Sequence, residues 1–132
     1  MKWNLLPKIK VLVVEDDKFN RMLVKSLLLK LGNVEVIEAK DGLEALSILD
    51  HEEEIDICLL DLHMPILNGF ETLKIIRGGT LFENISVIVI TSDELEKKQS
   101  LKLGANDFIT KPLSLEKFQS KIYQQLVHLV QE

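Results

Sequence analysis

Carboxylates follow two apolar runs of the sequence at the point where each run ends. Glu15 and Asp16 come directly after Val11–Val14, and Asp61 comes directly after Ile57–Leu60. If both runs are buried strands of one sheet, these acids meet at one edge, where like charges are held together only if a cation joins them. Carboxylate oxygens are ligands that Mg²⁺ prefers, together with waters and phosphate oxygens. The sequence therefore predicts a divalent-cation site.

Two further polar side chains fit the same edge. Thr91 follows Ser86–Ile90, and Lys111 comes shortly after Phe108. The whole set suits phosphoryl transfer to a carboxylate, in which Asp61 is the nucleophile and forms an acyl phosphate. The cation and the Lys111 ammonium would offset charge on the phosphoryl oxygens. The Thr91 hydroxyl can donate a hydrogen bond to such an oxygen and can move toward it, which would report the modification.

Strand-like apolar runs alternate with segments of helical periodicity along the chain. Strands are predicted at Lys10–Val14, Val34–Glu38, Asp56–Leu60, Ser86–Ile90 and around Phe108-Ile109. Helices are predicted at Lys18–Leu31, Gly42–Asp50, from just after Pro65 to near Arg77, at Glu94–Leu103 and at Ser114–Val130. This alternation predicts a five-stranded parallel sheet covered on both faces, a doubly wound α/β fold. Ligands bind outside the carboxyl ends of such strands, where the polar groups fall.

The first and last helices are apolar over more than one narrow stripe. The first has a face of Phe19, Leu23, Val24, Leu27, Leu28 and Leu31, widened by Met22 and Leu29. The last has one stripe of Phe118, Ile122, Leu126 and Leu129 and a second of Tyr123, Val127 and Val130. The simpler interpretation is a wide face turned to the core. The alternative is a surface that binds a partner.

Length and composition describe one globular domain. Residues 1–132 are predicted as a single domain, with residues 1–8 as an N-terminal extension in which Trp3 caps the bottom of the sheet. The net charge of −5 argues against general nucleic-acid binding, which needs a basic face. Cys58, the only cysteine, is expected to pack in the core. Because no apolar run is long enough to span a membrane, a cytoplasmic location is expected.

Four segments occur together in a specific order and spacing. They are Val11-Leu-Val-Val-Glu-Asp-Asp17 with Asn20-Arg21, Asp61-Leu-His-Met-Pro65 with Asn68-Gly69, Ile90-Thr-Ser92, and Phe108-Ile-Thr-Lys-Pro112. Through these segments essentially the whole chain resembles the receiver domains of bacterial two-component response regulators. The resemblance implies a flavodoxin-like (βα)5 fold with strand order 2-1-3-4-5. It also implies a role like that of the single-domain chemotaxis regulators.

The resemblance assigns roles to individual residues. It implies that Asp61 is the phosphoacceptor and that Asp16 binds Mg²⁺ directly together with Asp61. Glu15 would act through a coordinated water, and the backbone carbonyl of His63 would be a further ligand. Thr91 and Lys111 match the phosphate-sensing hydroxyl and the phosphate-binding lysine.

Two further implied features follow the fifth strand. Phe108 occupies the position of the switch aromatic residue. The bond between Lys111 and Pro112 is where such domains carry a cis peptide.

Several positions depart from the commonest pattern of the family. Glu15 replaces the more usual Asp, and its longer side chain would alter metal affinity. Phe108 has no hydroxyl, so it cannot make the hydrogen bond of a tyrosine. Ser92 stands where Ala or Gly is usual and would narrow access to the phosphoacceptor. His63 and Asp93 lie at positions that tune dephosphorylation in this family; an aspartate there would either orient a water or repel an anion.

The resemblance also implies partners. The phosphoryl group would come from a sensor histidine kinase or a histidine phosphotransfer protein that docks on the first helix. A downstream protein, or a second copy in a homodimer, would bind the last two units. Because the sequence ends with the last helix, we expect no output domain, output by protein contact and no direct DNA binding, and Met1 favours a stand-alone protein. Two alternatives remain: a pseudo-receiver that binds partners without phosphorylation, and an aspartyl phosphatase. The phosphatase would need an acid where His63 stands.

Overall fold

A computed structural model describes residues 8–52, 54–79 and 84–130, so Trp3 and most of the predicted N-terminal extension lie outside the described residues. The strands are β1 (Ile9–Val14), β2 (Val34–Ala39), β3 (Ile57–Asp61), β4 (Ser86–Thr91) and β5 (Asp107–Thr110). The helices are α1 (Lys18–Leu29), α2 (Gly42–His51), α3 (Gly69–Gly78), α4 (Glu94–Lys102) and α5 (Leu115–Val130). The predicted elements are all present, with ends that differ by one to a few residues.

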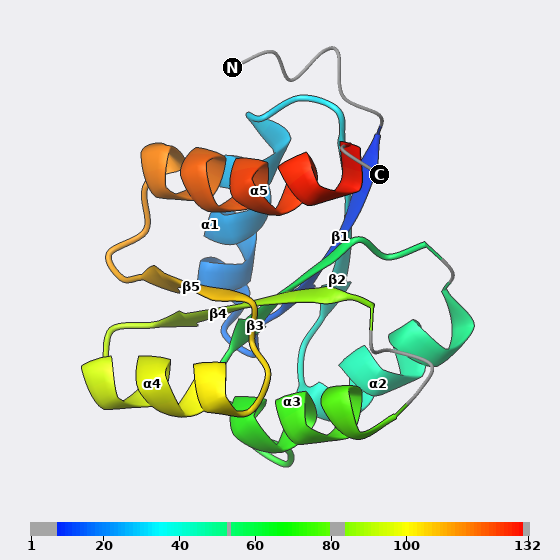
Figure 1. Cartoon of the computed structure of the whole chain (residues 1–132), viewed down its shortest axis with the longest axis vertical. Helices are drawn as coiled ribbons and strands as arrows, with labels where there is room; N and C mark the ends of the chain where they lie inside the picture. The colour runs from blue at the N-terminus through cyan, green and yellow to red at the C-terminus, as the bar shows by residue number, and fades with distance from the viewer. Residues whose placement is uncertain (1–7, 53, 80–83, 131–132) are drawn as a thin grey trace.

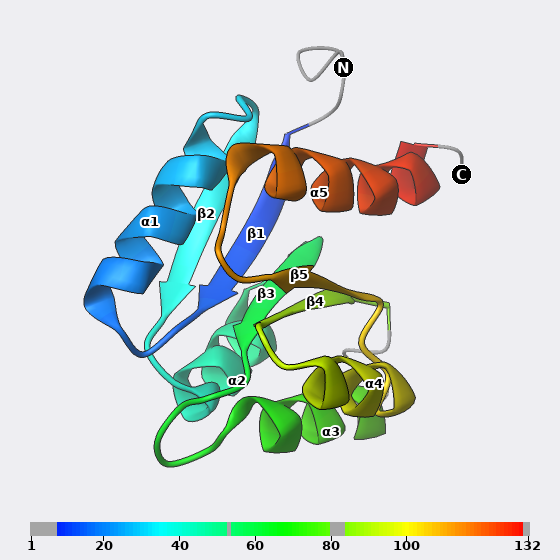
Figure 2. The same cartoon turned by 90° about the vertical axis from the view of Figure 1, so that its left-hand side faces the viewer.

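The five strands form one parallel sheet in the order β2-β1-β3-β4-β5. Helices α1 and α5 cover one face of the sheet, and α2, α3 and α4 cover the other (Figures 1 and 2). The predicted doubly wound α/β fold and its strand order are therefore confirmed. Because β1 and β3 are neighbours, their carboxyl ends lie side by side, and this adjacency creates the site.

The central strands are apolar on both faces because each face packs against helices. All residues of β3 are buried, and two hydrophobic clusters fill the two layers. Cys58 is fully buried in the α2–α3 layer, and burial raises the pKa of its thiol to about 12. The thiol therefore stays protonated and packs as a small apolar side chain, as predicted.

The core-facing interpretation of α1 is wrong for part of its apolar surface. Its side chains Val24, Leu27 and Leu28 are buried. By contrast, Phe19 is 79% exposed, and Met22, Leu23 and Leu29 are also exposed. A single helix turns only one stripe to the sheet, and this apolar surface is wider than that stripe. Leu43 of α2 is also exposed, whereas Leu49 is buried.

Helix ends show a second small correction. Helix α1 ends at Leu29 instead of Leu31, and Gly32 adopts a positive φ of 87° in the turn that follows.

On α5, Phe118, Ile122 and Leu126 are buried while Tyr123 is exposed. The backbone N–H of Lys117 donates to Ser114 Oγ, which supports the predicted N-cap. Among the described residues, no helix is long and apolar enough to cross a membrane.

Gly69 allows α3 to begin directly against the end of β3. Its N–H donates to the carbonyl of Leu62 at 3.1 Å. A Cβ at Gly69 would lie 2.5 Å from the backbone oxygen of Asp61 and 2.5 Å from the Cα of Leu62, whereas a Cβ at Gly78, in the same helix, would meet nothing within 4 Å. The glycine therefore sets how closely the helix approaches the strand end that carries Asp61.

We predict that Gly69→Ala lowers the free energy of unfolding by about 1–3 kcal/mol, because backbone atoms must shift to admit the methyl group. Gly78→Ala is the matched control and should be neutral or slightly stabilising. Chemical denaturation of both variants measures the difference. Equal stabilities would show that the close approach at Gly69 is not a packing constraint.

Candidate functional site

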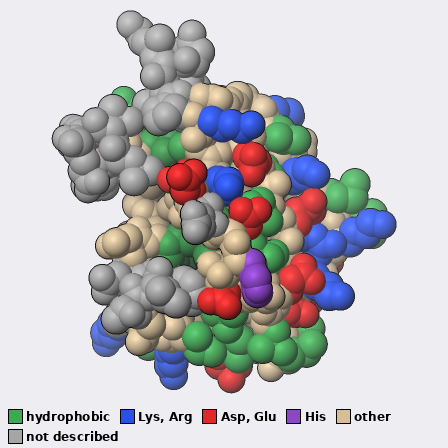
Figure 3. Space-filling view, turned by 90° about the vertical axis from the view of Figure 1, so that its right-hand side faces the viewer, with side chains coloured by type: hydrophobic (Ala, Val, Ile, Leu, Met, Phe, Trp, Pro, Cys, Tyr) green, Lys and Arg blue, Asp and Glu red, His purple; other side chains and the backbone are tan. Residues whose placement is uncertain are grey.

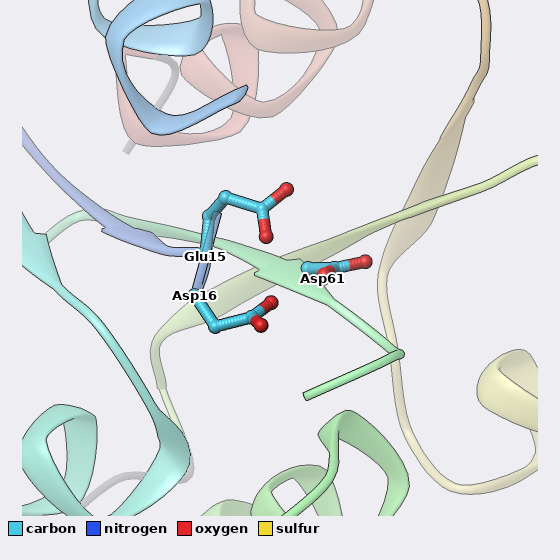
Figure 4. Close-up of side chains that lie close together, drawn as sticks. All are labelled: Glu15, Asp16 and Asp61. Atoms are coloured by element: carbon cyan, nitrogen blue, oxygen red, sulfur yellow. The ribbon is translucent and has the colours of Figure 1, made fainter. Parts of the chain in front are cut away.

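Three carboxylates meet at the carboxyl ends of β1 and β3. Glu15 and Asp61 are buried, with 6% and 4% of their surfaces exposed, and Asp16 is exposed. One oxygen of each carboxylate lies within 4.8 Å of the other two, around a common space (Figure 4). The predicted acidic cluster is therefore present.

Backbone contacts fix Glu15 in this cluster. Its N–H donates to the carbonyl of Ala39 at 3.0 Å, which continues the pairing of β1 with β2. Its carbonyl accepts from Arg21 Nη1 at 2.8 Å, and its Oε2 accepts from the N–H of Asp17 at 3.2 Å. Asp17 in turn is the N-cap of α1. The carboxylate thus sits between a strand end and a helix start, with little freedom to leave.

The electrostatic cost of the cluster falls on Glu15. The pKa of Glu15 is raised from 4.5 to about 8, first by burial and then by the hydrogen bond and the negative charge of Asp61. A divalent cation among the three carboxylates would remove this cost. Hard oxygen donors at this spacing, one of them solvent-exposed, fit Mg²⁺, which retains part of its water shell.

Lys111 approaches Asp61 from the opposite side. Its Nζ lies 3.9 Å from Asp61 Oδ1, and the side chain is partly exposed. The backbone around it is anchored, because Lys117 Nζ donates to the carbonyls of Thr110 and Pro112 at 3.0 and 2.7 Å. The peptide bond between Lys111 and Pro112 is cis, as predicted. Lys117 was missed in the sequence because an exposed-looking helical lysine carries no signal of this anchoring.

His63 contributes to the cluster through its backbone. Its N–H approaches Asp61 Oδ1 at 3.4 Å. Its exposed ring turns away to α4, where Nε2 lies 2.8 Å from Glu96 Oε2 and 2.9 Å from Glu96 Oε1. The metal-binding role of the His63 carbonyl stays a prediction.

Thr91 is buried at the end of β4, and its hydroxyl is bonded to α4. Oγ1 donates to Glu96 Oε1 at 2.7 Å and accepts from the N–H of Asp93 at 3.1 Å. Sequence reasoning missed Glu96. A weak signal was available, because an acid three residues after Asp93 is typical of a helix N-terminus.

Asp93 and Ser92 both lie on the surface beside the site. Asp93 is the N-cap of α4, and its Oδ1 accepts from the N–H groups of Leu95 and Glu96 at 2.8 and 3.1 Å. This capping role holds the carboxylate against the helix. The tuning roles of Asp93 and Ser92 stay predictions.

Phe108 is partly buried between two helices. Lys97 Nζ of α4 lies 5.0 Å from the centre of its ring, and Lys121 Nζ of α5 lies 4.8 Å from it. Ammonium groups at such distances are attracted to an aromatic ring. In this structure the aromatic ring is therefore held by cations and by packing instead of by a hydroxyl contact.

The wider surface is mixed in charge. On the described part of the face drawn in Figure 3, acidic and basic side chains are interspersed. This face therefore offers no continuous basic stripe of the kind that tracks a nucleic-acid backbone.

Comparison with known proteins decides the family. Residues 11–123 match the family model of the response regulator receiver domain. The chain belongs to this family. It is 33% identical to a chemotaxis protein CheY homolog of Campylobacter jejuni, over 86% of this chain and 88% of the relative. It is 34% identical to the chemotaxis protein CheY1 of Helicobacter pylori, over 86% and 93% of the two chains.

A solved structure agrees with this assignment. The co-crystal structure of the Saccharomyces cerevisiae histidine phosphotransfer signalling protein Ypd1 and the receiver domain of its downstream response regulator Ssk1 holds a similar chain. That chain is 30% identical to this receiver domain, with a TM-score of 0.82, over 93% of this chain and 92% of the other.

We predict that the metal-free receiver domain loses stability as the pH rises. Glu15 is protonated in both states below its ordinary pKa of 4.5, and folding holds it protonated up to about pH 8. Its contribution to stability is therefore complete below pH 4.5 and is lost as the pH rises through about 8. Thermal unfolding in EDTA measures this trend.

Glu15→Gln should flatten the trend and raise the unfolding midpoint of the metal-free protein at pH 8 by a few degrees. Mg²⁺ should stabilise the wild type more than this variant, because the variant has one fewer carboxylate. Identical pH profiles of the two proteins in EDTA would contradict the electrostatic account of the cluster.

Proposed function

We propose that this receiver domain accepts a phosphoryl group on Asp61 from a phosphohistidine of a partner protein. The observation that carries the proposal is the position of Asp61. Its carboxylate is buried between the acids at the end of β1 and the ammonium of Lys111, 3.9 Å from Asp61 Oδ1. A carboxylate nucleophile beside an ammonium group and a cluster of acids that suits Mg²⁺ fits phosphoryl transfer, where positioning and electrostatics dominate.

The chain's own residues account for most of the proposed reaction. A carboxylate oxygen of Asp61 forms the new O–P bond while the P–N bond to the partner's imidazole breaks, and the electron pair of that bond stays on the imidazole nitrogen. The Lys111 ammonium holds a phosphoryl oxygen on one side. On the other side, Mg²⁺ would be held directly by Asp16, Asp61 and the His63 carbonyl, and through a water by Glu15. The cation would offset negative charge on the phosphoryl group.

The same proposal assigns the switch and the lifetime of the acyl phosphate. Thr91 would turn its hydroxyl to a phosphoryl oxygen, and Phe108 would respond by repacking between its two lysines. His63, Ser92 and Asp93 would set how fast water removes the phosphoryl group. The phosphatase alternative lacks support, since the His63 ring is paired with Glu96 and no acid stands at that position.

Helix α1 offers a docking surface for the phosphodonor. Phe19, Met22 and Leu29 are exposed, and Met22, Lys25, Ser26, Leu29 and Lys30 line a shallow hollow. The helix begins at Lys18, directly after the acidic cluster, so a partner on this surface is within reach of Asp61. The similar chain from the Ypd1–Ssk1 co-crystal supports a histidine phosphotransfer protein or a histidine kinase as this partner.

A second surface would carry the output. Leu95 and Leu101 of α4 and Tyr123 of α5 are exposed on the two last helices. A downstream protein or a second copy of the chain would bind there, as the sequence resemblance implies. Output through protein contact is consistent with the similarity to chemotaxis regulators over most of their length.

The first test is modification of the protein itself. With Mg²⁺ and phosphoramidate, the wild type should gain the mass of one phosphoryl group, and Asp61→Asn should gain none. Asp50→Asn, which removes an exposed acid of α2, is the control and should react like the wild type. No reaction of the wild type would favour the pseudo-receiver, and a reaction that survives in Asp61→Asn would place the acceptor elsewhere.

The second test concerns the docking surface. Phe19→Ala should slow transfer from a phosphorylated histidine phosphotransfer protein by about tenfold, because it removes a large apolar side chain from the contact. Its reaction with phosphoramidate should be unchanged. Ile75→Ala, which truncates an exposed apolar residue of α3, should leave both rates unchanged. If Phe19→Ala slows the reaction equally with both phosphodonors, the substitution has damaged the site and has not specifically weakened docking.

A further inference from the structure

Glu96 joins two residues that belong to different loops of the site. Its Oε1 accepts a hydrogen bond from Thr91 Oγ1 at 2.7 Å, and its carboxylate lies 2.8 Å from His63 Nε2. The Glu96 side chain is only 15% exposed and Thr91 is buried, so their contact is shielded from water, whereas the His63 side chain is 70% exposed. The hydroxyl of Thr91 is therefore committed to α4, and the distance between Thr91 and Glu96 is typical of a strong, charge-assisted hydrogen bond.

The start of α4 shows what this contact replaces. Asp93 is the N-cap and Glu96 is three residues further on, the spacing of a capping box, in which the acid bonds back to the N–H of the cap residue. Helix α3 contains the complete box, with Glu71 Oε1 accepting from the N–H of Asn68 at 3.1 Å. In α4 the N–H of Asp93 donates to Thr91 Oγ1 instead. Thr91 thus stands between the two halves of an otherwise complete capping box.

We propose that Glu96 is a positioning residue that holds the Thr91 hydroxyl away from Asp61 in the unphosphorylated protein. When Thr91 turns to a phosphoryl oxygen, it leaves both Glu96 and the Asp93 N–H. These two groups then bond to each other and complete the capping box of α4. The helix start therefore has two alternative hydrogen-bonding arrangements, and the choice between them depends on Thr91.

This inference rests on the proposed function, since it assumes that Thr91 binds the phosphoryl group on Asp61. It adds that Glu96 competes with the phosphoryl oxygen for the hydrogen bond of the Thr91 hydroxyl. A protein that must break a charge-assisted hydrogen bond before it binds a ligand has a lower apparent affinity for that ligand than a protein without this bond. Removal of Glu96 should therefore raise the apparent affinity for a phosphoryl analogue.

The test is a titration with beryllofluoride in excess Mg²⁺, followed by amide NMR signals of the site. Glu96→Ala should lower the half-saturating beryllofluoride concentration by about tenfold, the effect of one hydrogen bond to a charged group. Glu96→Gln keeps an acceptor oxygen without the charge and should fall between the wild type and Glu96→Ala. The control, Glu116→Ala, removes an exposed acid from the first turn of α5 and should match the wild type.

A double-mutant cycle separates positioning from a general effect on α4. In a Thr91→Ala background, Glu96→Ala should no longer change the half-saturating concentration, because the hydroxyl that it holds is gone. Side-chain scalar couplings of Thr91 in the free protein give a readout that needs no ligand. They should report a shift of rotamer in Glu96→Ala.

The outcomes distinguish the two levels of the proposal. If the wild type does not bind beryllofluoride, the proposed function fails. If the wild type binds it but Glu96→Ala has the same affinity and the same Thr91 rotamer, only the role of Glu96 is overturned. An equal change in affinity with and without the Thr91 hydroxyl would also overturn it.

Discussion

Negative charge is crowded where β1 and β3 end, and this crowding is the constraint around which the site is built. Parallel strands that are neighbours in a sheet must deliver their carboxyl ends to the same place, so Glu15 and Asp61 share one partly dehydrated space. Burial, and then the nearby Asp61, raise the pKa of Glu15, which shows that the charged form is costly in this arrangement. Such a cluster suits a bound cation, and the nearby Lys111 ammonium suits a phosphoryl group beside that cation.

The elements around the cluster hold it in place by short, fixed connections. Asp17 caps α1 two residues after Glu15, and Gly69 lets α3 start against the backbone of Asp61. Asp93 caps α4 two residues after Thr91. Each of these three helix starts thus lies within a short connection of a strand end that carries a candidate site residue. A side chain that moves at the site is therefore only a few residues from the start of a helix, and its movement can shift that helix.

Two exposed surfaces lie next to the site, one on α1 and one on α4 and α5. Helix α1 presents apolar side chains next to the acids, and α4 and α5 hold Phe108 between Lys97 and Lys121. The first surface lies beside Asp61, the proposed nucleophile, and therefore suits a phosphodonor. The second lies beyond Thr91 and Glu96, where a change at the site would be displayed to a partner.

The amino-acid sequence alone determined the alternation of strands and helices, the parallel sheet and the edge where Glu15, Asp16, Asp61 and Lys111 lie together and where β4 ends in Thr91. Periodicity and strand ends are local properties, so they can be read without coordinates. Only the tertiary structure decided which apolar residues of α1 face water and which partner holds the Thr91 hydroxyl. Exposure of Phe19 depends on how wide a stripe the sheet covers, and the contact with Glu96 depends on how the loop after β4 packs against α4. Both are set by packing between elements, for which the sequence has no local signal.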